Sequence, residues 1–176
     1  MGQLDWSIET VATVNASPER VMTWWFSPER QNDFRDRIEN TGATDFTLSE
    51  STTDGVRVRT STWKDRRGWV HHHRTEWHLD PDGIPPHRGD RFVAPGSDTV
   101  SFEHPRGRKI GFTCTARIEF VPDTNGSTKI AVIHSHETTG GTWFQQRAIR
   151  SWDLKKGTTT RQFDESIARC RAAMTL

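Results

Sequence analysis

The C-terminal stretch TWFQQRAIRSWDLKKGTTTRQFDESIARCRAAM, residues 142–174, decides the fold. It begins with a capping box, Thr142 and Gln145, and its apolar residues then recur at three- and four-residue steps. We predict one long helix of about 50 Å, because each helical residue adds about 1.5 Å along the axis. Gly157 and the threonines at 158–160 are poor helix formers and predict a bend. We expect the second half to pack as core and the first half to help close a pocket.

Length and charge restrict the class of protein. The chain has 176 residues, which suits the single domain, residues 1–176, that we predict. Its formal net charge of +1 gives no argument for a nucleic-acid partner. We interpret the basic cluster as a solvated strand face: Arg57, Arg59, Lys64, Arg66 and Arg67.

Cellular location is inferred from what the sequence contains. No apolar run reaches the roughly 18 residues that span a bilayer, and residues 1–6 do not follow a signal-peptide pattern. The two cysteines, Cys114 and Cys170, fit free thiols in a reducing compartment. We therefore expect a soluble, cytoplasmic protein without membrane insertion.

Alternating apolar residues predict strands between the helical segments. Residues 6–14 form a first strand, and Ser17-Pro18 and Ser27-Pro28 each begin a short helix. Residues 81–96 are rich in Pro and Gly and predict a long loop. Six further strands are predicted over residues 43–50, 56–64, 69–80, 99–103, 110–121 and 128–137.

These elements predict an α+β fold. It has a seven-stranded curved antiparallel sheet, two short helices and a long C-terminal helix. One helix laid across a strongly curved sheet does not fill the concave side. We therefore expect an enclosed cavity between helix and sheet.

The sequence resembles the START/Bet v 1-like (SRPBCC) superfamily, of the polyketide cyclase and lipid-transfer type. The resemblance rests on residues 8–25, where the run VNASPERV at 14–21 is followed by Trp24, and on the element order. It implies the helix-grip fold and an internal pocket for an apolar or aromatic small molecule. It transfers no catalytic residues, because no site motif of the superfamily matches residue by residue.

Histidines on the predicted inward faces are the candidate chemistry. His71 and His73 lie two apart on one strand, and His134 and His136 on another, so each pair shares a face. His72 points outward on this parity, as does His78. The resemblance implies that the two inward pairs face each other across the cavity.

Three interpretations of these histidines stay open. They line a wet pocket or pair with neighbouring groups; they recognise a ligand or transfer protons, with His73 and His134 as catalytic candidates; or they bind a metal. No carboxylate has an obvious place as a further metal ligand, since Glu76 falls on the opposite face. We therefore predict no metal and no cofactor.

The eight tryptophans exceed what the core requires and favour stacking on a flat ligand. Arg147 and Arg150 could meet a carboxylate or phosphate at the pocket mouth. The predicted ligand-binding residues are Trp69, His71, His73, Trp77, Cys114, His134, His136, Trp143 and Arg147.

The sequence thus predicts a binder of a hydrophobic, aromatic or polyketide-like small molecule. One alternative is a polyketide cyclase or dehydratase that uses inward histidines for proton transfer. A second is a protein-interaction module like the co-chaperone relatives of the superfamily, which predicts a filled cavity.

Overall fold

The computed structural model describes residues 4–175, except for the side chains of residues 28, 29 and 31–33. The strands are β1 (Asp5–Val14), β2 (Thr44–Thr53), β3 (Val56–Lys64), β4 (Val70–His78), β5 (His87–Arg88), β6 (Arg91–Glu103), β7 (Lys109–Pro122) and β8 (Thr128–Gly140). The helices are α1 (Pro18–Trp25), α2 (Pro28–Glu39), α3 (Trp143–Lys156) and α4 (Thr158–Met174), and a 3-10 turn, Thr124–Gly126, joins β7 to β8.

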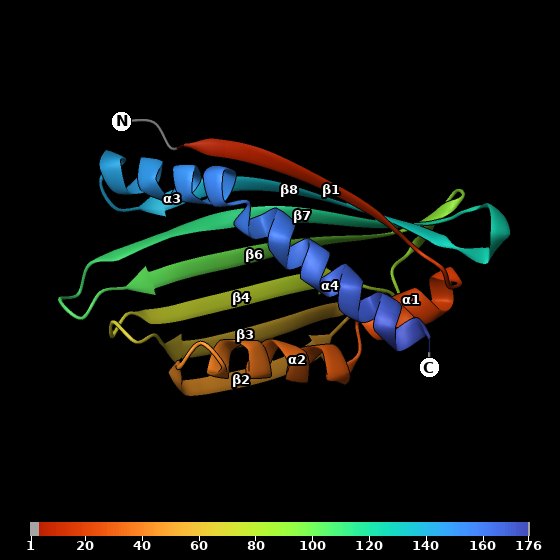
Figure 1. Ribbon diagram of the computed structural model, residues 1–176, viewed down its shortest axis with the longest axis horizontal. Helices are drawn as coiled ribbons and strands as arrows, with labels where there is room; N and C mark the ends of the chain where they lie inside the picture. The colour runs from red at the N-terminus through yellow and green to blue at the C-terminus, as the bar shows by residue number, and fades with distance from the viewer. Residues whose placement is uncertain (1–3, 176) are drawn as a thin grey trace.

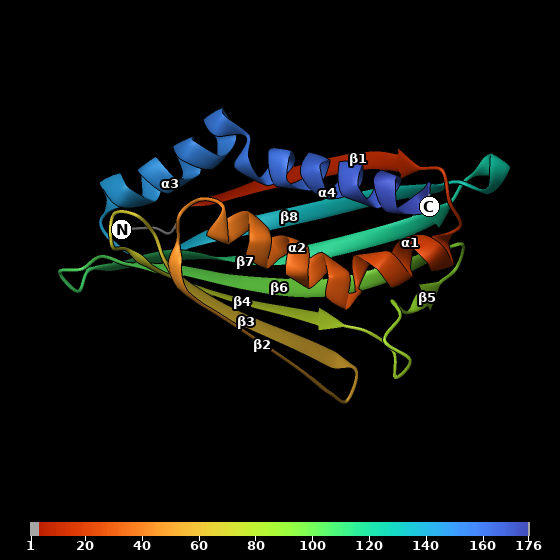
Figure 2. The ribbon, with the colours of Figure 1, turned by 60° about the horizontal axis from the view of Figure 1, so that its bottom comes forward.

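The strands form one antiparallel sheet in the order β1-β8-β7-β6-β4-β3-β2, with β5 paired to β6. The four helices lie on one face of this sheet, which we call the inner face (Figure 1, Figure 2). Helix α4 runs diagonally across it, α3 lies along β8, and α2 lies beside β2. The predicted α+β helix-grip architecture and its seven strands are confirmed. No helix among residues 4–175 is both long and apolar enough to cross a lipid bilayer.

The region predicted as a long loop is partly strand. β6 begins at Arg91, well before the predicted strand at residues 99–103, and β5 pairs with its first residues. Pro95 and Gly96 suggested a loop, but a close contact explains the glycine: a Cβ at Gly96 would come within 2.5 Å of the Trp77 ring. The predicted loop over residues 81–96 is therefore wrong in its C-terminal part.

The C-terminal stretch forms two helices. Gly157 is left-handed, with φ 58° and ψ 39°, and it ends α3 just before α4 begins. The predicted bend is found at this residue, but the single long helix is wrong because its hydrogen-bond ladder is interrupted there. The capping box of Thr142 and Gln145 is confirmed.

The apolar core lies between α1, α4 and one end of the inner face. Trp25 of α1 meets Phe163 of α4 at 6.4 Å and Phe120 of β7 at 6.0 Å between ring centroids. The second half of the C-terminal stretch therefore packs as core. The fully or almost fully buried members of this core are Val14, Val21, Met22, Ala94, Ile118, Phe120, Ile130, Ile167 and Cys170.

A buried carboxylate holds the bend between α3 and α4 against β1. Asp153 accepts a hydrogen bond from Trp6 Nε1 at 2.8 Å, although the two residues lie 147 positions apart. It also accepts from the backbone N–H of Thr159 at 3.0 Å and from its hydroxyl at 2.9 Å, in the first turn of α4. One side chain thus caps α4 across the break and fixes the entry of β1.

Replacing Asp153 should therefore loosen the whole C-terminal region. We expect Asp153→Ala to lower the free energy of unfolding by about 3 kcal/mol, because it leaves buried donors without an acceptor. Urea unfolding followed by circular dichroism measures this change. Asp164→Ala, at an exposed position of α4, is the matched control and should stay within about 0.5 kcal/mol of wild type. Equal stability of the two variants would contradict this role of Asp153.

Candidate functional site

The strand register brings chemically active side chains into one line across the inner face. Each member of this line is the Cα partner of the next on the neighbouring strand. We call this line the central row. From β1 to β2 it contains Trp6, His136, Cys114, Asp98, Thr75, Arg59 and Glu50.

His136 is the most enclosed imidazole of the predicted set. Its side chain is 4% exposed, and neither ring nitrogen has a hydrogen-bond partner among the described residues. The ring lies parallel to Phe112, at 5.5 Å and 4°, and 4.8 Å from the Trp6 ring. Its Nδ1 lies 3.8 Å from Asp153, beyond hydrogen-bond range. Burial lowers the pKa of His136 to about 4, with a smaller opposing effect of Asp153, so the ring is neutral at pH 7.

His134 and Asp98 form the polar centre of the inner face. The Nδ1 atom of His134 is buried without a partner among the described residues. Burial lowers the pKa of His134, while the negative charges of Asp98 and Asp153 act against this shift. Burial raises the pKa of Asp98, although a hydrogen bond from Thr75 opposes the rise. A carboxyl with a raised pKa beside a neutral imidazole is a pair suited to proton transfer.

Aromatic rings cover the inner face on one side of the central row. Trp63 stacks on His71 at 4.9 Å and 15°, and lies 4.6 Å from the His73 ring. The contacts continue from His71 to Phe102 at 5.0 Å and from Phe102 to Phe112 at 6.5 Å. A chain of rings therefore runs from β3 across the sheet to His136. We call these residues the aromatic cluster: Phe34, Phe46, Trp63, His71, His73, Phe102 and Phe112.

The two histidines of β4 have different surroundings. Nε2 of His71 lies 3.2 Å from Oδ2 of Asp65, which fixes this ring. His73 lies between Trp63 and Phe34, and burial lowers its pKa to about 3, with a further contribution from the neighbouring His71. His73 therefore stays neutral at pH 7 and takes up a proton less readily than an ordinary histidine.

The other predicted site residues lie in three different places. The Trp69 ring meets that of His104 at 4.8 Å near the turn before β4. The exposed Arg147 places its guanidinium 4.6 Å from the centroid of Trp143, on α3. Cys114 is buried in the central row, and burial raises the pKa of its thiol to about 12, so it is protonated at neutral pH.

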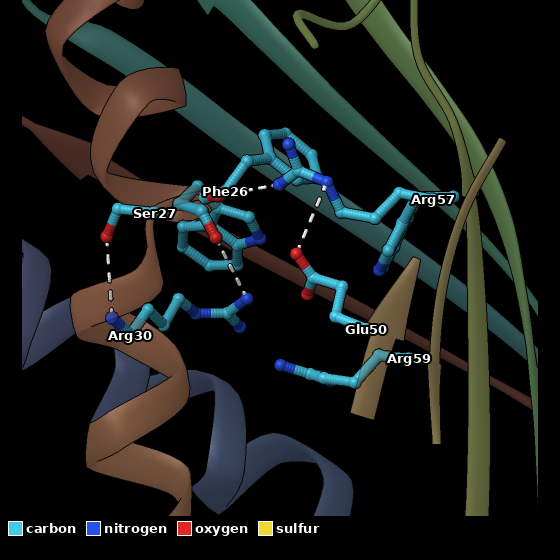
Figure 3. Close-up of a pocket in the computed structure, with 8 residues that line it drawn as sticks. Phe26, Ser27, Arg30, Glu50, Arg57 and Arg59 are labelled. Atoms are coloured by element: carbon cyan, nitrogen blue, oxygen red, sulfur yellow. Dashed lines mark hydrogen bonds and ion pairs between the residues drawn. The ribbon is translucent and has the colours of Figure 1, made fainter. Parts of the chain in front are cut away.

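A small pocket lies at the far end of the central row, where α1 and α2 meet the sheet (Figure 3). The pocket has a volume of about 20 Å³. One of its lining residues, Trp77, was predicted from the sequence to bind the ligand. The others are Trp25, Phe26, Ser27, Arg30, Glu50, Arg57 and Arg59. We call this site the arginine pocket.

The arginine pocket corrects the interpretation of the basic cluster. Arg57 and Arg59 were predicted to lie on a solvated strand face, but both point to the inner face, as Trp63 does on the same strand. The even spacing from Arg57 to Trp63 is the signal in the sequence that indicates this orientation. Arg30 was not predicted, because the charged residues that share the pocket with it lie on strands distant in the sequence.

Two further observations concern a second depression on the surface and possible metal ligands. An open depression of about 420 Å³ lies between α1 and the end of α4, lined by Glu19, Arg20, Thr23, Trp24, Ser27 and Met174. Within residues 4–175, apart from the undescribed side chains, no group of three or more His, Cys, Asp and Glu side chains is arranged to hold a metal ion.

No protein-family model matches the sequence, and no curated protein matches it. Solved structures do. A putative uncharacterized protein from Rhizobium leguminosarum superposes with a TM-score of 0.61 at 11% identity, over 98% of this chain and 99% of that one. Norcoclaurine synthase from Thalictrum flavum gives 0.56 at 13% identity, over 100% and 99%. The Zhui aromatase/cyclase from Streptomyces gives 0.55 at 12% identity, over 96% and 94%.

These three likenesses extend over almost the whole of each chain, and their low identities carry information about the fold alone. The element order, the sheet topology and the closing C-terminal helix agree with the resemblance drawn from the sequence. The chain has the helix-grip fold, as these solved structures do.

Proposed function

We propose that the protein binds a small molecule with a flat, unsaturated body on the inner face of its sheet. The observation that carries this proposal is a set of three imidazole nitrogens, Nδ1 of His134 and both ring nitrogens of His136, that are buried without hydrogen-bond partners among the described residues. A buried polar group without a hydrogen bond costs about 1–3 kcal/mol. A hydroxyl or carbonyl group of a ligand would recover that cost.

The aromatic cluster supports a flat ligand. The rings of Phe112 and His136 lie parallel, and Trp63 stacks on His71, so flat surfaces already line this side of the inner face. Such surfaces favour offset stacking on another ring. Because burial keeps His73 and His136 neutral, the same surface stays compatible with an uncharged apolar body.

Ligands of structural neighbours are consistent with this proposal. Norcoclaurine synthase, which shares the fold, has been crystallised in complex with dopamine and hydroxybenzaldehyde, both single-ring aromatic compounds. The fold therefore accommodates molecules of this chemical class in at least one protein.

A second candidate function is acid–base catalysis, as in a cyclase or dehydratase of a polyketide-like substrate. The specific observation is the proximity of Asp98, whose pKa is raised, to the neutral imidazole of His134. His134 would accept a proton from an enolisable carbon, and Asp98, whose raised pKa favours the protonated form, would donate one to the departing hydroxyl. His73, held neutral among aromatic rings, would position the substrate in this scheme.

Binding is testable with two flat probes that differ by one hydroxyl. We expect naphthol to quench tryptophan emission on binding, and to bind about tenfold more tightly than naphthalene because it pairs with an imidazole nitrogen. His136→Phe keeps the ring packing and should remove the preference for naphthol. His78→Phe, at an exposed position, should keep it. Unchanged emission with both probes would remove the proposed function.

The buried histidines also predict how stability depends on pH. The folded pKa values of His73 and His136 lie below the ordinary value of 6.5, so below about pH 6.5 the unfolded chain takes up protons that the folded chain does not. Stability is therefore greatest above that pH and falls as the pH drops toward 4. For His136 alone we expect a loss of roughly 2–3 kcal/mol between about pH 7 and about pH 4.5.

Urea unfolding at several pH values measures this loss in wild type and in His136→Phe. The variant should show a shallower pH dependence, and His78→Gln should follow wild type. Asp98 acts in the opposite direction, because its raised pKa favours proton uptake by the folded state, and the comparison with wild type cancels its effect. Identical slopes for wild type and His136→Phe would show that His136 is not held neutral.

A further inference from the structure

The arginine pocket concentrates positive charge inside the fold. Arg30 comes from α2, while Arg57 and Arg59 come from β3, and their side chains converge on one space together with Glu50 of β2 (Figure 3). Three guanidinium groups therefore share the pocket with one carboxylate. Arg37 and Arg169 add further positive charge close to Arg30.

Among the described residues, one guanidinium nitrogen of this pocket has no hydrogen-bond partner, and two others donate to backbone carbonyls. Arg30 Nη1 donates to the carbonyl of Trp25 at 3.2 Å, and Arg57 Nη1 donates to the carbonyl of Phe26 at 2.6 Å. Nε of Arg57 is buried without a hydrogen bond to any residue that the structure describes, and it lies 3.8 Å from Oε1 of Glu50. Figure 3 shows Arg59 pointing into the same space from β3.

The electrostatic state of the pocket favours an added negative charge. Burial, together with the positive charges of Arg59 and Arg37, lowers the pKa of Arg30 to about 9. Burial also lowers the pKa of Arg59, while the negative charges of Asp98 and Glu50 act against this shift. Both side chains remain cations at pH 7, so their mutual repulsion and desolvation are costs that an anion would offset.

The size and walls of the pocket restrict the anion. Its 20 Å³ is little more than the space of a water molecule, which suits the two oxygens of a carboxylate better than a phosphate group. Trp25, Phe26 and Trp77 supply apolar walls for the atoms that carry the carboxylate. The planar fork of a guanidinium matches a carboxylate in a bidentate geometry.

We propose that the arginine pocket binds the carboxylate of the ligand, so that the natural ligand is an aromatic or other flat carboxylic acid. This inference rests on the proposed function, because it names the ligand class of the same inner face. Arg59 lies four strand spacings from His136 along the central row, which is about 19 Å. Naphthol reports the imidazole end of this row, whereas a carboxylic acid probe reports the arginine end.

The test compares naphthoate with naphthamide, which has the same shape and no charge. Wild type should bind naphthoate at least about tenfold more tightly, as a charge-assisted bidentate pair predicts. Arg59→Gln should abolish this preference without weakening naphthamide, and Glu50→Gln should increase it by removing the competing carboxylate. Arg161→Gln, at an exposed position of α4, is the matched control and should leave the preference unchanged.

The outcomes separate the two proposals. Equal binding of naphthoate and naphthamide to wild type would overturn the carboxylate site and leave the binding function standing, and this comparison requires no variant to fold. A preference for naphthoate that survives both Arg59→Gln and Arg57→Gln would also overturn the site. If naphthoate, naphthamide and naphthol all fail to bind, the proposed binding function and the carboxylate site are both wrong.

Discussion

The antiparallel register of the seven long strands is the constraint on which the rest of the structure depends. Side chains alternate between the two faces of a strand, so the pairing that turns Ile118 and Phe120 inward also turns Asp98 and His136 inward. The sheet cannot bury its apolar residues under α4 without also enclosing the central row. The inner face therefore combines an apolar end with a polar middle, and it must supply partners to groups that would otherwise be costly to bury.

Different helices cover the apolar and the polar parts of the inner face. Helix α4 and α1 cover the apolar end, where Phe163 and Trp25 meet. The break at Gly157 lets α3 leave that line and follow β8, and Asp153 secures the break by bonding Trp6 and Thr159. At the other end of the central row α2 brings Arg30 to the arginines of β3. The same fold thus leaves imidazoles at one end of a row of polar groups and guanidinium groups at the other.

Local patterns in the sequence predicted much of this fold. Strand alternation identified seven strands, and the capping box at Thr142 was found where expected. Features that depend on distant residues were not accessible. Gly96 suggested a loop. A glycine is needed at this position because the ring of Trp77, on another strand, leaves no room for a side chain, and the sequence does not reveal that contact. The pairing of Trp6 with Asp153 and the convergence of Arg30 with Arg59 likewise require the three-dimensional structure.

The central claim is that the inner face, along the central row, is a binding surface with a carboxylate site at one end. A crystal structure of the protein with bound naphthoate tests this claim most directly. The account predicts the carboxylate within hydrogen-bond distance of Arg59, with the rings lying over Thr75 toward Asp98. Naphthoate bound only in the outer depression beside Trp24 and Met174, with the arginine pocket unchanged, would contradict it.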